Sequence, residues 1–501
     1  MTLAHLLDLQ PVVALAAHDL VTLLPIEALT VSAVVVMLVG TFHTSHRLTV
    51  GLTLAGLAWT LAMVPIAQVQ HDHQVSALFI VDDWALFFIV LLALTTAAVV
   101  LLSYGYLERR NQHPHDYYTL LLLATLGGTA LVSSSHFASF FLGLEILSVS
   151  LYALIAYPRL REDYVEAGVK YLVLAAATAA FLLFGMALIY AELGTMSLLG
   201  FARLHVAAGG AAQTSILVGG AALVIVGIGF KLGVVPFHMW TPDIYQGAPA
   251  PVTAFIATVS KGAMFALLLR YFREVRLQPH DTLWIVFAVI AAASMIAGNL
   301  LALLQANVKR LLAYSSIAHL GYLLVAFLAA GRNAAVAVGV YLVAYFVTTL
   351  VAFGVVSELS GVTADADEID DYRGLAARRP MLAAVFAVAL FSLAGIPLTI
   401  GFIGKFYVVT AGAGSSLWWL LVVLVVMSTV GLFYYTRLVV AMYVRESNEM
   451  PSTTRLVDLG VVAGSAAGAT VLAVLAVLVL ALGVYPTPLV RLLEHIVSTL
   501  P

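Results

Sequence analysis

Cysteine is absent from this chain of 501 residues, and charged residues are scarce. The lack of cysteine excludes disulfides, cysteine-ligated iron–sulfur clusters and thiolate zinc sites, so any electron transfer has to take place in another protein. Charged residues make up 10% of the chain and hydrophobic residues 62%, whereas a soluble domain carries about 25% charged residues. The composition therefore predicts a protein whose solvent is lipid.

No polar linker divides the chain, and no basic patch favours nucleic acid, so we expect one membrane domain over residues 1–501. Apolar runs of about 20 residues can cross a bilayer as helices, and these runs are too long and continuous for barrel strands. The predicted fold is all-α and polytopic. The fourteen predicted spans are residues 20–40, 48–68, 78–103, 117–133, 137–157, 168–191, 214–235, 250–270, 283–305, 310–330, 333–358, 380–410, 416–443 and 459–484.

The distribution of Lys and Arg predicts the orientation of these spans. With the N-terminus outside, the cytoplasmic loops carry twelve basic residues and the exterior segments carry six. Cytoplasmic loops are enriched in basic residues, so both termini are expected on the periplasmic side of a bacterial inner membrane. The acidic run over residues 365–371 is then expected to be a solvated cytoplasmic loop.

Four ionisable residues stand out deep inside predicted spans, where each costs at least about 2.5–3.5 kcal/mol. Static buried ion pairs are the alternative to a function in ion transport. Buried lysine exchanges its proton readily, whereas arginine does not, so the use of three lysines favours a proton path. These residues are Glu145, Lys231, Lys261 and Lys405.

His319 is a fifth candidate, because histidine titrates near neutrality and its neighbours include Ser315, Ser316 and Tyr322. A buried histidine without a role in transport is the alternative.

Helix-breaking residues lie beside two of the lysines. Gly233 and Pro236 follow Lys231, and Gly395 and Pro397 precede Lys405. Interrupted helices in corresponding positions of two halves indicate the binding site of a transporter.

A spacing of 174 residues relates Lys231 to Lys405 and Glu145 to His319. Because this spacing equals five spans, an odd number, the two halves are predicted to be inverted repeats. The repeats would occupy residues 117–270 (spans four to eight) and residues 283–443 (spans nine to thirteen).

Several motifs resemble the antiporter-like, proton-translocating subunits of bacterial NADH–quinone oxidoreductase (complex I), and those of subunit N in particular. The resemblance covers about residues 20–485. It rests on residues 166–171, 230–253, 260–261, 312–322 and 394–407.

This resemblance implies fourteen helices and two inverted five-helix repeats, each with a broken helix. It implies that Glu145 and Lys231 form a coupled ion pair, that Lys261 connects the halves, that His319 is a relay and that Lys405 is the terminal proton site. NAD, FMN, iron–sulfur clusters and quinone are expected in partner subunits, with no cofactor in this chain. Those partners would include peripheral subunits and further antiporter-like subunits. One departure is Gln246, where the family often has Glu.

Two other functions remain open at this point. An Mrp-like cation/proton antiporter subunit has the same composition and related motifs. A membrane scaffold without transport would tolerate replacement of Lys231 or Lys405 by Met with little change in stability or pumping.

Overall fold

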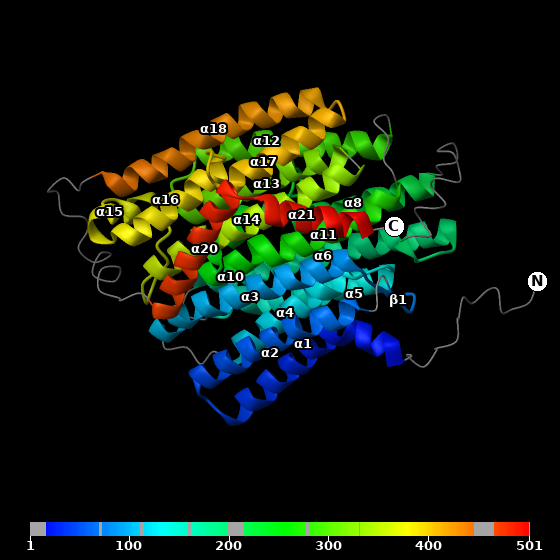
Figure 1. The fold of residues 1–501 in the computed structure, drawn as a ribbon, viewed down its shortest axis with the longest axis horizontal. Helices are drawn as coiled ribbons and strands as arrows, with labels where there is room; N and C mark the ends of the chain where they lie inside the picture. Colours follow the sequence, from blue (N-terminus) through cyan, green and yellow to red (C-terminus); the bar gives the residue numbers. More distant parts are fainter. Residues whose placement is uncertain are drawn as a thin grey trace, which may run out of the picture.

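Long apolar helices that run roughly side by side form nearly all of the structure (Figure 1). The computed structural model describes residues 17–69, 73–110, 115–158, 162–198, 215–275, 281–329, 331–444 and 465–499. The sequence-based orientation also rested on arginines that lie outside these residues, namely Arg159, Arg161, Arg203, Arg276, Arg445 and Arg455.

The first half of the chain contains eleven of the helical elements described. They are α1 (Ala17–Phe42), α2 (His46–Gln68), α3 (Asp83–Arg109), α4 (His115–Val132), α5 (Phe137–Ile155), α6 (Glu162–Leu193), α8 (Ser215–Leu232), α9 (Trp240–Gly247), α10 (Ala250–Phe255), the π-helix η2 (Ile256–Ser260) and α11 (Lys261–Val275). A short antiparallel hairpin of β1 (His73–Val75) and β2 (Phe79–Val81) precedes α3 and pairs His73 with Val81.

The second half contains the remaining helical elements. They are α12 (Thr282–Leu303), α13 (Val308–Ala329), α14 (Gly331–Leu359), the 3₁₀ helix η3 (Ile369–Tyr372), α15 (Leu375–Arg378), α16 (Pro380–Ala394), α17 (Ile400–Gly414), α18 (Trp418–Tyr443), α20 (Ala466–Val484) and α21 (Thr487–Thr499).

The polytopic helical fold predicted from the sequence is confirmed. Among the described residues, twelve helices are long and apolar enough to cross a membrane. The other two predicted spans also correspond to helices: residues 117–133 to α4, and residues 380–410 to the pair α16 and α17. The hairpin before α3 and the terminal helix α21 were not predicted.

Three spans form the buried centre of the bundle. The continuous helix from α10 through η2 to α11, and the helices α13 and α14, are buried along their apolar lengths. Outer helices such as α6 and α18 instead expose large apolar side chains, including Phe184 and Phe433. Such a surface requires an apolar surrounding, as expected for a membrane domain.

The predicted breaks are present in both halves. Helix α8 ends before Gly233, whose φ is +71°, and helix α16 ends before Gly395, whose φ is +86°. Glycine adopts this left-handed conformation without the steric cost that a side chain would add. The chain then begins a new helix, α9 in the first half and α17 in the second.

The two ends of the bundle are named here after their arginines. The Arg109 face carries Arg109, where it donates to the Ser357 carbonyl at the end of α14. The Arg270 face carries Arg270, which binds the two carboxylate oxygens of Asp82 at 2.6 Å each. Asp82 also caps α3, so this ion pair fastens the start of α3 to α11.

Candidate functional site

Glu145 and Lys231 lie on α5 and α8. Glu145 is at the middle of α5 and is half-buried, whereas Lys231 is in the last turn of α8 and is only 3% exposed. The carboxylate and the ammonium interact electrostatically. Among the described residues, however, no direct hydrogen bond or ion pair joins them.

The ammonium of Lys231 instead binds two hydroxyl groups. It donates to Ser148 Oγ at 3.0 Å and to the Tyr171 hydroxyl at 3.2 Å. Ser148 follows Glu145 by three residues and therefore shares its side of α5. The coupling between acid and base is therefore electrostatic without a direct bond, and a hydroxyl one turn further along α5 makes the direct contact with the ammonium.

Lys261 is the first residue of α11, directly after the π-helical turn η2. Its ammonium is buried and donates to Ser316 Oγ at 2.7 Å. Ser316 also accepts a hydrogen bond of 2.8 Å from the Tyr345 hydroxyl. A π-turn inside a span often marks a functional site, and here it brings the lysine of one half against α13 of the other.

His319 lies at the middle of α13 and is bound by tyrosines of two other helices. Its Nδ1 is 2.7 Å from the hydroxyl of Tyr341 on α14, and its Nε2 is 3.2 Å from that of Tyr435 on α18. The ring also lies against that of Tyr345, with centroids 5.6 Å apart. His319 is therefore next to the hydrogen-bonded group that holds Lys261.

Lys405 binds the end of the helix before its own. Its ammonium donates to the carbonyl oxygens of Leu393 at 3.0 Å and Ala394 at 2.8 Å, and to Ser428 Oγ at 2.8 Å. The last carbonyls of a helix have no amide partner within it and favour a cation. The break between α16 and α17 thus provides the site for this lysine.

The two broken helices place their lysines differently. Lys231 precedes its break, whereas Lys405 follows its break. Gly395 lies 162 residues after Gly233, so the spacing of 174 that relates the lysines does not relate the breaks. The two halves therefore do not correspond at one fixed offset along the sequence.

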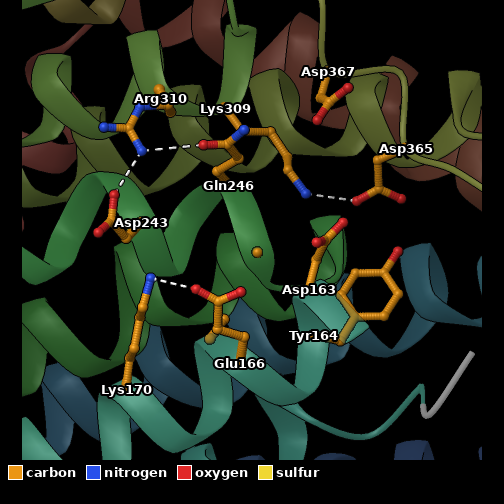
Figure 2. Close-up of a pocket in the computed structure, with 12 residues that line it drawn as sticks. Asp163, Tyr164, Glu166, Lys170, Asp243, Gln246, Lys309, Arg310, Asp365 and Asp367 are labelled. Atoms are coloured by element: carbon orange, nitrogen blue, oxygen red, sulfur yellow. Dashed lines mark hydrogen bonds and ion pairs between the residues drawn. The ribbon is translucent and has the colours of Figure 1, made fainter. Parts of the chain in front are cut away.

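A cavity of about 330 Å³ opens near the Arg109 face, and we call it the vestibule (Figure 2). It is lined by α6, α9, the start of α13 and the loop after α14. At its rim, Lys170 pairs with Glu166, and Arg310 pairs with Asp243 and Gln246. Its charged lining residues are the acids Asp163, Glu166, Asp243, Asp365 and Asp367 and the bases Lys170, Lys309 and Arg310.

Asp365 lies at the inner end of the vestibule and is buried, so the prediction of a fully solvated acidic loop is wrong at this residue. Its carboxylate accepts from Lys309 at 2.7 Å, from Arg110 at 2.9 Å and from the Tyr106 hydroxyl at 2.7 Å. Burial by itself raises the pKa of Asp365, but Lys309 and Arg110 more than offset it, and the pKa lies well below its usual value.

Sequence reasoning found the charged residues but missed most of their partners. Tyr171, Tyr345 and Tyr435 are aromatic residues in apolar helices, and nothing in the sequence separates them from ordinary core residues. Asp365 carried one signal, because it begins the acidic run in the loop that follows a predicted span. Such a position allows an ion pair but does not specify one.

The broken helices, the buried lysines and the hydroxyl groups between them define the class of antiporter-like membrane subunits. The sequence model of the family described as "NADH:quinone oxidoreductase/Mrp antiporter, TM" matches residues 134–431. Within this class, the chain belongs to the family of NADH-quinone oxidoreductase subunit N. It is 50% identical over 489 residues to the subunit N of Nitrosospira multiformis, covering 95% of this chain and 96% of the relative.

A solved structure agrees with this placement. A chain of respiratory complex I from Thermus thermophilus is 33% identical, with a TM-score of 0.78, and the match covers 93% of this chain and 98% of that one. A chain of the Mrp complex from Dietzia sp. DQ12-45-1b has a TM-score of 0.83 at 22% identity, covering 97% of this chain and 98% of that one. The second likeness shows a shared fold.

Proposed function

We propose that this chain is a membrane-arm subunit of NADH–quinone oxidoreductase that carries a proton path, coupled to quinone reduction in partner subunits. The observation that carries the proposal is the presence of buried lysines in both halves, each bound to hydroxyl groups inside apolar helices. Lys231, Lys261 and Lys405 each bind at least one serine hydroxyl. Subunit N relatives at 50% identity supply the redox context.

The path would run from Glu145 and Lys231 through Lys261 and His319 to Lys405. Lys261 and His319 lie on either side of Tyr345. The Tyr345 hydroxyl and Lys261 both donate to Ser316, and the Tyr345 ring packs against His319. Charged groups about 4 Å apart interact by about 4 kcal/mol at an effective dielectric constant of ~20. Movement of one proton along such a series therefore changes the proton affinity of the next site.

The vestibule is the proposed inlet for protons. Its five acidic and three basic lining residues give it an excess of negative charge, which attracts cations from water. Ala167 lines the vestibule and lies one turn before Tyr171, the partner of Lys231. We assign the Arg109 face to the cytoplasm, which places both termini on the periplasmic side of the inner membrane.

The two halves are proposed to be inverted repeats over residues 117–270 and 283–443. In support, α4 packs against α5 as α12 packs against α13, and each half contains one broken helix. In this correspondence between the halves, the first break is equivalent to the second. The two lysines that lie 174 residues apart are then not equivalent positions.

NADH oxidation and quinone reduction belong, in this proposal, to partner subunits that hold NAD, FMN, iron–sulfur clusters and quinone. Other membrane subunits, including further antiporter-like ones, would contact its exposed apolar helices together with lipid. An Mrp-like antiporter is the less favoured function, since the likeness to the Mrp chain is 22% in sequence against 33% for complex I.

The test replaces Lys231 by Ala and Glu145 by Ala in the assembled complex. Proton pumping is measured in vesicles during NADH oxidation, with assembly checked on a native gel. We expect assembled complexes with strongly reduced pumping.

Arg373→Ala is the control, because Arg373 is an exposed base paired with Asp370, lies outside the vestibule lining and the proposed path, and should leave pumping unchanged. Normal pumping by assembled Lys231→Ala and Glu145→Ala complexes would refute the proton path.

A further inference from the structure

Thr241 has a buried hydroxyl group that no other feature of the structure explains. It lies in the first turn of α9, directly after the first break, and is 0% exposed. Its backbone amide donates to the His238 carbonyl, but its Oγ1 has no hydrogen-bond partner among the described residues. A buried hydroxyl without a partner costs about 1–3 kcal/mol. This cost would be removed if the hydroxyl gained a hydrogen-bond partner in another state of the protein.

Among the residues that the structure describes, Lys261 lacks sufficient hydrogen-bond acceptors, where Thr241 lacks a hydrogen-bond partner. Its ammonium carries three N–H donors and is 1% exposed, yet its one hydrogen bond within the described part of the chain goes to Ser316 Oγ. The rings of Trp240 and Tyr245 lie near the ammonium, at 5.9 and 5.2 Å from their centroids. These aromatic faces attract the charge but leave two donors without acceptors.

Gly233 brings these two incomplete groups to the same place. A β-carbon on this residue would lie 2.4 Å from Thr241 Oγ1 and 3.4 Å from Lys261 Nζ. The hydroxyl and the ammonium therefore border one small space, and the absence of a side chain at the break keeps it open. Any larger residue would close the gap between them.

We infer that the Thr241 hydroxyl is a second acceptor for Lys261, and that the ammonium alternates between Ser316 and Thr241. With Ser316 it belongs to the group of Tyr345 and α13, in the second half. With Thr241 it reaches the break that follows Lys231, in the first half. Thr241 is thus a positioning residue that makes the central lysine a two-position carrier between the halves. The inference rests on the proposed proton path.

The test uses Thr241→Val and Thr241→Ser in the assembled complex. Valine keeps the shape of threonine without the hydroxyl, whereas serine keeps the hydroxyl. Pumping and NADH oxidation are measured in vesicles, with assembly on a native gel. We expect coupled turnover to fall about tenfold in Thr241→Val, the order of effect of one hydrogen bond to a charged group, and to be restored in Thr241→Ser.

Two further variants make the outcome specific. Thr60→Val is the matched control, since Thr60 is equally buried but donates to the Gly56 carbonyl of its own helix, α2, which packs against α1, α3 and α4. It should leave turnover unchanged. Lys261→Met tests the path itself and should abolish coupled pumping.

The outcomes separate the two proposals. Loss of pumping in Lys261→Met with normal turnover in Thr241→Val overturns the role of Thr241 alone. Normal pumping in Lys261→Met overturns the proton path. Equal loss in Thr241→Val and Thr241→Ser also overturns the inference, since it would show that the shape of threonine matters and its hydroxyl does not.

Discussion

The buried cluster around Asp365 contains two positive groups and one negative group. One carboxylate faces the ammonium of Lys309 and the guanidinium of Arg110, and all three groups are buried. Removal of one partner from a buried ion pair leaves an uncompensated charge and costs about 3–5 kcal/mol. The cluster ties the end of α3 to the start of α13 and to the loop after α14. It therefore closes the inner end of the vestibule at a fixed place.

Asp365→Asn should destabilise the protein strongly, because it leaves two buried cations without a countercharge. We expect a loss of about 3–5 kcal/mol, seen as a lower melting temperature and a smaller yield of assembled complex. Asp370→Asn is the control, since Asp370 and its partner Arg373 are both exposed. Its melting temperature should equal that of the wild type.

The pH dependence of this loss has a definite sign. The pKa of Asp365 lies well below its usual value because Lys309 and Arg110 outweigh the effect of burial. The stabilisation is therefore fully present above about pH 4, the ordinary aspartate range, and is lost only at lower pH. The difference in melting temperature between wild type and Asp365→Asn should be constant from about pH 5 to 8. A difference that shrinks within this range would contradict the assignment.

At the scale of elements, the pair α16 and α17 depends on a very close approach of its two helices. A β-carbon on Gly401 would lie 1.9 Å from the Ser392 carbonyl oxygen. The Gly401 amide donates to Ser392 Oγ, which in turn is 3.0 Å from Thr348 Oγ1 on α14. The first turn of α17 is thus fixed against the last turns of α16, and Lys405 is held next to the carbonyls that it binds.

Gly401→Ala should force these helices apart. Overpacking of this kind costs about 1–3 kcal/mol, and the shift should also move Lys405 away from its acceptors, so coupled pumping should fall. Gly414→Ala provides the comparison, because no atom lies within 4 Å of the added carbon at the end of the same helix. Thermal stability and pumping of both variants measure the effect, and equal behaviour would contradict this view of the break.

Helices and breaks that arise from local sequence could be predicted, whereas those that depend on packing could not. Apolar runs of span length form helices with little competition from other structures, so the sequence predicted the long helices, α20 included. It did not predict the short helices α9 and α15. The breaks were also readable, because Gly233, Pro236, Gly395 and Pro397 interrupt such runs. The π-helical turn before Lys261 and the amphipathic helix α21 were not, since each depends on packing against other helices.

For the whole molecule, the absence of cysteine offers a direct test of orientation. A single cysteine introduced at Asp370, near the Arg109 face, should react with a membrane-impermeant maleimide only from the cytoplasm. A single cysteine at His495 on α21 should react only from the periplasm. Both side chains are exposed in the structure. Labelling of this subunit in right-side-out and inside-out vesicles measures the result, and the reverse pattern would invert the proposed topology.

The assembled site was only partly predictable at this scale. The sequence identified Glu145, Lys231, Lys261, His319 and Lys405 as unusual, because a charged or polar group in an apolar run has an energetic cost. Which groups meet depends on the packing of distant spans. Ser148 and not Glu145 binds Lys231, and tyrosines of α14 and α18 bind His319. Their roles in transport stay predictions until pumping is measured.

The number of hydrogen bonds that Lys405 can donate depends on its protonation state. An ammonium has three N–H groups, and Leu393, Ala394 and Ser428 take one each. A neutral amine has two, so one of these oxygens must lose its donor whenever the proton departs. Two of the three belong to the backbone end of α16. If Lys405 carries protons, its discharge can therefore leave a carbonyl at the end of α16 without a donor, which would couple the charge of the side chain to the geometry of the break.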